Sequence, residues 1–127
     1  MKKTMLLMLA MLLLAGCAGS KTDVSYRQIT MDEAVAMMEK ETVYIILDVR
    51  TVQEFQEKHI PGAINIPNEE IGASQIPQLP DKDQLILVYC RSGNRSKQAS
   101  EKLAALGYTN VVEFGGINSW PGETVSG

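Results

Sequence analysis

The sequence contains little cysteine, little histidine and no excess of positive charge. Its two cysteines, Cys17 and Cys90, leave at most one internal disulfide. The formal net charge of −3 argues against a nucleic-acid partner and against electrostatic binding to lipid headgroups. The longest apolar run, Met5 to Ala15, has 11 residues, whereas a helix that crosses a bilayer needs about 20. The 127 residues therefore have room for one domain of modest size.

The N-terminus is typical of a bacterial export signal. Lys2 and Lys3 precede the apolar run, and Leu14-Ala15-Gly16-Cys17 then resembles the lipobox of bacterial lipoproteins. This resemblance implies that residues 1–16 are a signal peptide and that Cys17 is lipid-modified. The alternative is an ordinary secretory signal in which Cys17 is incidental.

The lipoprotein interpretation sets the domain boundaries and the location. Residues 17–25 are then the lipidated cysteine and a small polar tether, and residues 26–127 are the folded domain. We expect the protein to be exported and lipid-anchored to the bacterial cell envelope, on the periplasmic side or at the cell surface. Stable anchoring needs more than one acyl chain.

From Tyr26 onward, strand-like runs alternate with helix-like runs. Capping boxes at Thr30–Glu33 and Thr51–Glu54 predict two helix starts, the second helix ending near Lys58. Residues 96–106 have helical periodicity. The predicted strands are residues 26–29, 43–49, 63–66, 85–89 and 108–114, with Gly115-Gly116 breaking the last. This alternation predicts an α/β domain with a mostly parallel sheet.

The segment that follows the strand at residues 85–89 has the composition of an anion-binding loop. A strand-to-helix junction has free backbone N–H groups and the positive end of a helix dipole. Here two arginines add charge, two serines can donate hydrogen bonds, and a Gly-Asn pair tolerates positive φ angles. The candidate binding residues are Arg91, Ser92, Gly93, Asn94, Arg95 and Ser96.

Cys90 opens this loop and is the candidate nucleophile. Backbone N–H groups and arginines around a thiol favour the thiolate, which is the reactive form. No adjacent histidine base is then required. The single histidine, His59, precedes Ile60-Pro61-Gly62 and is expected to fix a turn. The alternative is that Cys90 is a small buried hydrophobic residue.

Asp48 lies near the carboxyl end of the other strongly apolar strand, residues 43–49, and Arg50 follows that strand. If the two strands are neighbours, Asp48 and Cys90 are expected to face one crevice beyond their carboxyl ends. We assign Asp48 and Arg50 a supporting role, orienting the loop or capping helices. Arg95 either points into the pocket or fixes the loop to an acid such as Glu113 or Asp48.

Four stretches in order resemble single-domain rhodaneses. They are Leu47–Arg50, Glu54-Phe55 through His59 to Pro67, Cys90–Ser96, and Gly115-Gly116 to Trp120. The resemblance implies a rhodanese-like α/β fold, with a five-stranded, mostly parallel sheet flanked by helices on both faces. It also implies a sulfurtransferase. Cys90 would attack the outer sulfur of a donor such as thiosulfate, release sulfite, and pass the persulfide sulfur to cyanide or a thiol.

Other interpretations stay open. Cysteine-dependent phosphatases, some of them on this fold, and arsenate reductases also use a thiolate. Tyrosine phosphatases have a C-x5-R loop, whereas Cys90 and Arg95 form C-x4-R, and the narrower ring favours a single sulfur atom over a phosphoryl group. A non-catalytic redox-sensing or binding module is a third interpretation.

The sulfurtransferase interpretation implies a specific set of partners. They are a small anionic sulfur donor, a thiol or protein sulfur acceptor, and the membrane through the lipid anchor. We expect no cofactor, metal or nucleic acid, and we expect a monomer.

Overall fold

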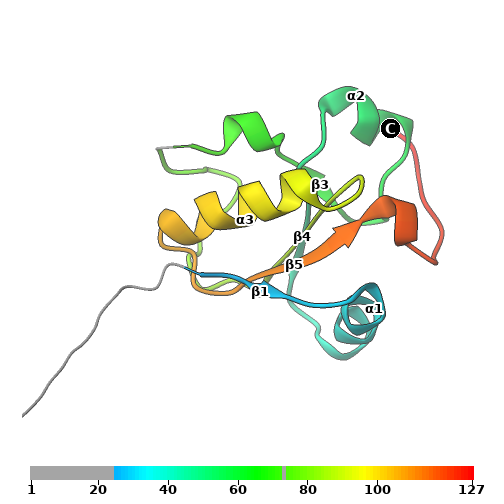
Figure 1. Cartoon of the computed structure of the whole chain (residues 1–127), viewed down its shortest axis with the longest axis horizontal. Helices are drawn as coiled ribbons and strands as arrows, with labels where there is room; N and C mark the ends of the chain where they lie inside the picture. The colour runs from blue at the N-terminus through cyan, green and yellow to red at the C-terminus, as the bar shows by residue number, and fades with distance from the viewer. Residues whose placement is uncertain (1–24, 73) are drawn as a thin grey trace, which may run out of the picture.

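A five-stranded sheet in which every pairing is parallel forms the centre of the computed structural model, which describes residues 25–72 and 74–127 (Figure 1). This confirms the expected fold class. The expected signal peptide, Cys17 and the tether up to residue 24 lie outside the described residues. The spatial order of the strands is β1 (Arg27–Gln28), β5 (Val111–Gly116), β4 (Ile86–Cys90), β2 (Ile45–Asp48) and β3 (Ile64–Asn65).

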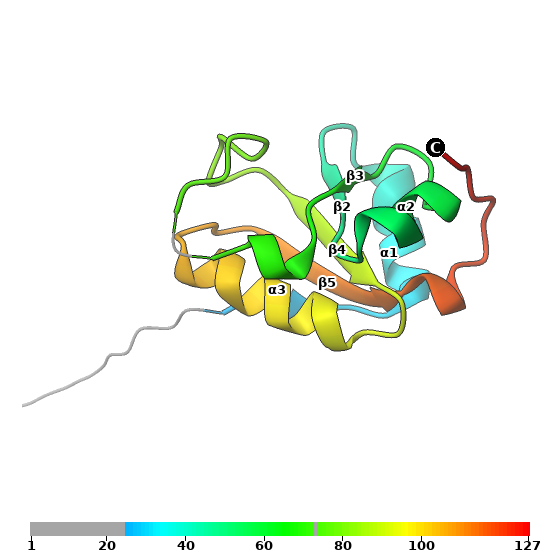
Figure 2. The same ribbon diagram turned by 90° about the horizontal axis from the view of Figure 1, so that it is seen from above.

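Helices cover both faces of this sheet (Figures 1 and 2). The helices are α1 (Met31–Lys40), α2 (Val52–Glu57) and α3 (Asn94–Ala105), with short 3-10 turns at η2 (Asn68–Glu70) and η3 (Ile117–Ser119). On one face, Ala34 of α1 packs in a cluster with Leu87 of β4. On the other face, Ala99 of α3 packs in a cluster with Val88. Because β4 is central and covered on both faces, all five of its residues are buried, as its continuous apolar run predicts.

Both predicted capping boxes are present. The Thr30 hydroxyl accepts the Glu33 N–H at 3.1 Å, and the Glu33 carboxylate accepts the Thr30 N–H at 2.8 Å. Thr51 and Glu54 make the same reciprocal pair at 3.1 and 3.0 Å. These bonds span three residues, so a local sequence pattern is enough to predict them.

Several element boundaries differ from the sequence prediction. β2 begins at Ile45, whose N–H donates to the Leu85 carbonyl, and Val43 before it is 70% exposed. The last strand, β5, begins at Val111 rather than at Tyr108, because Tyr108 closes the end of α3 by donating its N–H to the Leu103 carbonyl. β5 also includes Gly115 and Gly116, so this pair does not break the strand, contrary to the prediction.

The expectation that Asp48 and Cys90 face one crevice is wrong. β2 and β4 are neighbours as predicted, but Asp48 is in register with Tyr89 rather than with Cys90. Successive side chains of a strand point to opposite faces. Tyr89 belongs to the cluster beneath α1, whereas Cys90 belongs to the cluster beneath α3. Asp48 therefore lies on the face opposite Cys90.

None of the helices within the described ranges is both long enough and apolar enough to span a membrane.

Candidate active site

Cys90 is the last residue of β4, and its side chain is only 1% exposed. Its Sγ accepts the Gly93 backbone N–H at 3.0 Å and lies 3.4 Å from the Ser96 hydroxyl. Gly93 has a φ of 120°, a left-handed conformation that favours glycine, and it is the N-cap of α3. The glycine thus turns the chain so that a backbone N–H points at the sulfur.

The loop from Cys90 to α3 is tight, and the end of β5 packs directly against it. Cys90 is in register with Gly116. A Cβ atom on Gly116 would lie 2.0 Å from the Arg91 carbonyl oxygen, so only glycine permits this approach. α3 begins at Asn94, and the first N–H groups of a helix have no intrahelical acceptor. The Gly93 N–H that points at the sulfur therefore lies at the start of α3, next to the first N–H groups of that helix.

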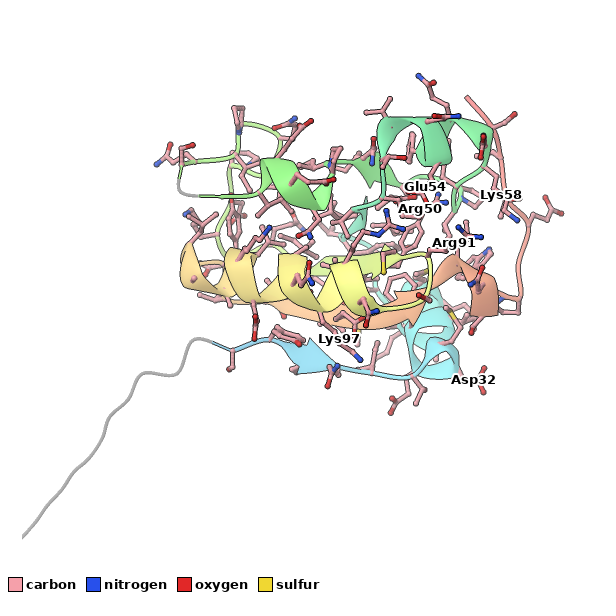
Figure 3. The ribbon with its side chains drawn as sticks, turned by 45° about the horizontal axis from the view of Figure 1, so that its top comes forward. Asp32, Arg50, Glu54, Lys58, Arg91 and Lys97 are labelled. Carbon is pink, nitrogen blue, oxygen red and sulfur yellow. The ribbon has the colours of Figure 1, made fainter. Side chains whose placement is uncertain are left out.

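The two loop arginines have different surroundings. Arg91 is exposed and lines a cavity of about 190 Å³ together with Arg50 and Lys58. Figure 3 shows Arg50, Glu54, Lys58 and Arg91 gathered at this end of the molecule, with Lys97 on the other side of the loop. The cavity is completed by Glu54, Glu57, Ile117 and Asn118.

Arg95 fixes the loop to α2. Its guanidinium bonds both carboxylate oxygens of Glu54, at 2.8 and 3.2 Å. This hydrogen bonding with Arg95 lowers the pKa of Glu54 to about 2, and the same pair raises the pKa of Arg95. The acid is neither Glu113 nor Asp48, the two partners that the sequence suggested.

Asp48 and Arg50 form a buried pair beside the cavity. The Arg50 guanidinium donates to both carboxylate oxygens of Asp48, at 2.7 to 3.1 Å, and also to the Lys58 carbonyl at 2.7 Å. The Asn65 amide donates to the carbonyl oxygens of both residues. The pair therefore joins the end of β2 to the segment after α2.

His59 lies away from Cys90. Its ring stacks on Phe55 with centroids 3.7 Å apart, and Nδ1 lies 2.8 Å from the Phe55 carbonyl oxygen. Its backbone pairs with Val125 of the C-terminal segment, which runs past α2 (Figure 2). These contacts hold His59 just after α2 and before the turn at Pro61-Gly62.

Sequence reasoning missed one acidic contact of the site. Ser96 is buried, and its hydroxyl lies 2.5 Å from Oε2 of Glu113 and 2.9 Å from the Gly93 carbonyl oxygen. Glu113 is only 2% exposed. An acid inside an otherwise apolar strand run, two residues before Gly115-Gly116, was the signal available in the sequence.

The remaining candidates are divided between the surface and the interior. Ser92 and Asn94 are exposed, whereas Gly93 and Ser96 are buried. Of the six loop candidates, Gly93 and Ser96 contact Cys90 Sγ, Arg95 bonds Glu54, and Arg91 lines the cavity. Among the described residues, no group of three or more His, Cys, Asp or Glu side chains has the arrangement of a metal site.

The fold and the loop define a class of protein: a parallel α/β domain with a cysteine at the carboxyl end of a central strand, inside a helix-capping loop. Comparison with known proteins is more specific. The family model for the rhodanese-like domain matches residues 30–123. The chain therefore belongs to the rhodanese-like family, and it is a transferase of the rhodanese type.

Individual relatives agree with this assignment. The chain is 42% identical over 71 residues to thiosulfate sulfurtransferase PspE of Escherichia coli (strain K12), covering 56% of this chain and 68% of that protein. It is 33% identical to thiosulfate sulfurtransferase GlpE of Pseudomonas savastanoi pv. phaseolicola, covering 80% and 97%. A solved structure of a rhodanese with anions from E. coli superposes with a TM-score of 0.61 at 38% identity, covering 66% and 99%.

Proposed function

We propose that this protein transfers sulfane sulfur from a small anionic donor such as thiosulfate to a thiophilic acceptor through a persulfide on Cys90. The Cys90 thiolate attacks the outer sulfur of the donor. A sulfur–sulfur bond forms to Cys90, the bond between the two donor sulfurs breaks, and its electron pair leaves with sulfite. A cyanide ion or a thiolate then takes the outer sulfur and restores the Cys90 thiolate.

One observation supports this proposal above the others: the Gly93 N–H is directed at Cys90 Sγ at 3.0 Å within a very tight loop. The N–H donor stabilises negative charge on the sulfur. Gly116 packs against the back of the loop without room for a side chain, so the ring has little freedom to widen. A ring of this size suits one added sulfur atom better than a phosphoryl group.

The cavity beside Arg91 suits an anionic donor. Arg91 and Lys58 are exposed cations on its wall, and buried Arg50 also lines it, so its three cations exceed its two carboxylates, Glu54 and Glu57. A solved relative at 38% identity is a rhodanese with anions. Arginine binds sulfonate-like oxygens with several donors at once. We infer that the oxyanion end of the donor occupies this cavity while its outer sulfur reaches Cys90.

The proposal is tested by intact mass after incubation of the reduced protein with thiosulfate. We expect the mass to rise by one sulfur atom, and we expect cyanide to reverse the gain with release of thiocyanate. Cys90→Ser is the matched control and should gain nothing, which also excludes sulfur on Cys17. Turnover of an aryl phosphate without sulfur uptake would contradict the proposal in favour of a phosphatase.

We also propose that the protein is exported and lipid-anchored through Cys17 to the cell envelope, and that it acts there as a monomer. The support is the sequence of residues 1–17, with its two lysines, apolar run and lipobox-like end. The acceptor would then be a thiol or a protein thiol outside the cytoplasm.

A further inference from the structure

Glu113 is an unusual residue for its position. Glu113 belongs to β5, beneath α3, and only 2% of its surface is exposed to solvent. A buried carboxylate is costly unless it is paired or hydrogen-bonded. The ion pairs found within the described residues join Arg50 to Asp48 and Arg95 to Glu54, so no cation is paired with Glu113 there. The carboxyl group must be stabilised in another way.

The contacts of Glu113 lead to Cys90. Oε2 accepts the Gly115 N–H at 2.9 Å and lies 2.5 Å from the Ser96 hydroxyl. The same hydroxyl lies 3.4 Å from Cys90 Sγ. On the other oxygen, Oε1, the Gln28 amide donates at the long distance of 3.4 Å. Ser96 therefore stands between a buried acid and the sulfur.

We propose that Glu113 holds the proton that Cys90 releases when it becomes a thiolate, with Ser96 as the relay between them. In the thiol form, Cys90 S–H donates to Ser96, and the Ser96 hydroxyl donates to the Glu113 carboxylate. In the thiolate form, neutral Glu113 donates to Ser96, and the Ser96 hydroxyl donates to the sulfur. One proton leaves sulfur and one arrives at carboxyl oxygen, so the pair keeps one negative charge throughout.

This shared proton solves an electrostatic difficulty. A thiolate and a carboxylate separated by one hydroxyl would repel each other strongly in a buried site. With one proton shared between them, only one of the two groups is charged at a time, and the sulfur accepts hydrogen bonds from Ser96 and Gly93 when it carries the charge. The use of this thiolate in sulfur transfer rests on the proposed function, whereas the proton relay itself does not.

The charged groups around the pair come from several elements. Lys97 of α3 and Glu33 of α1 line a cavity of about 480 Å³ that Glu113 also borders. Tyr26 lies before β1; its pKa is raised by burial and by the charges of Glu101 and Glu113. In the first turn of α3, Arg95 is close enough for its charge to interact with that of Cys90. The surrounding charge is therefore of both signs and does not by itself fix the proton on either group.

The pH dependence of Cys90 alkylation tests the proposal. Two groups that share a proton titrate as a pair, in two steps. We expect the rate of modification by iodoacetamide, measured on the Cys90-containing peptide of the full chain, to rise with pH in two steps separated by a plateau. Glu113→Gln, which is isosteric and cannot ionise, should lose the plateau and give a single step of full amplitude.

The control is Glu101→Gln, which removes an exposed acid on the adjacent helix and should keep the two-step profile. A single step in the native protein with the same midpoint in Glu113→Gln would overturn the relay. The relay would also be overturned if the native protein gave a single step and Glu113→Gln only moved that step to lower pH. That result would mean that Glu113 acts as a permanently charged carboxylate and does not share a proton with Cys90.

A second measurement separates the relay from a folding defect. Infrared spectra of the native protein at the plateau pH should contain the carbonyl band of a neutral carboxylic acid. Alkylation of Cys90 removes the thiolate, so the band should disappear, and Glu113→Gln should lack it from the start. Absence of the band in the native protein would contradict the proposal. Failure of sulfur uptake from thiosulfate with both signatures intact would refute the proposed function alone.

Discussion

At the scale of the residue, Arg91 and Arg95 show how two like side chains of one loop take different roles. Arg91 stays exposed beside the cavity, where it can meet an anion. Arg95 is held by both oxygens of Glu54, so its position is fixed by α2. Glu54 in turn serves two purposes, because the same side chain closes the capping box with Thr51. The start of α2 and the active-site loop are therefore tied together.

The Arg95–Glu54 pair gives a prediction for stability. Glu54→Gln should lower the free energy of unfolding at neutral pH by about 1 kcal/mol or less, because the pair is partly exposed to solvent. The pKa of Glu54 is about 2 in the fold, against an ordinary value of 4.5. The stabilisation of the fold by the Arg95–Glu54 pair is therefore fully present above pH 4.5 and is lost as the pH falls toward 2. Urea denaturation across this range measures the difference.

Glu57→Gln is the matched control for that experiment. Glu57 ends the same helix, and its carboxylate is not part of an ion pair among the residues that the structure describes. A loss of stability in Glu54→Gln that stays constant down to pH 2 would be evidence against the ion pair as its cause.

At the scale of the element, the active-site loop depends on the glycines of β5 as well as on its own sequence. Cys90 at the end of β4 is in register with Gly116, and the ladder between these strands shifts register between Val88 and Cys90. The irregularity lets the end of β5 pass close behind the loop. The geometry of Cys90 is thus set by two adjacent strand ends and a helix start.

Gly116→Ala tests this dependence. The added methyl would collide with the Arg91 backbone, so the loop must move. We expect a loss of about 1–3 kcal/mol in the free energy of unfolding, as for other overpacked sites, and slower gain of sulfur by Cys90. Denaturation and timed intact-mass measurements check the two effects.

Gly72→Ala provides the comparison, since a Cβ there meets no atom within 4 Å. It should leave both measurements close to those of the native protein. Native-like stability and sulfur uptake in Gly116→Ala would show that the loop is not held by this contact.

At the scale of the whole molecule, the proposed anchor and the folded domain are separate features. Cys17→Ser should move the protein from the membrane fraction to the soluble fraction of cells and abolish labelling by a fatty-acid analogue. Sulfur uptake by Cys90 should be unchanged, because the site is built from residues 48–118. Fractionation with parallel mass measurement checks both. Continued lipid labelling in Cys17→Ser would contradict the lipidation site.

The sequence by itself determined the local features of the protein. Capping boxes, continuous apolar strands and the Cys90–Ser96 loop are patterns of near neighbours, so the fold class and the candidate nucleophile could be predicted. Two strand starts were predicted wrongly, because Val43 and Tyr108 have strand-like character, yet Val43 lies exposed at a bend before β2 and Tyr108 closes the end of α3.

Only the tertiary structure decided which distant residues meet. Arg95 pairs with Glu54 across 41 positions, and Ser96 contacts Glu113 across 17. Strand register placed Asp48 on the face opposite Cys90, although each is the last residue of its strand. A shift of one residue in register moves every side chain of a strand to the opposite face of the sheet. A local sequence pattern does not determine the register between strands that are far apart in the chain.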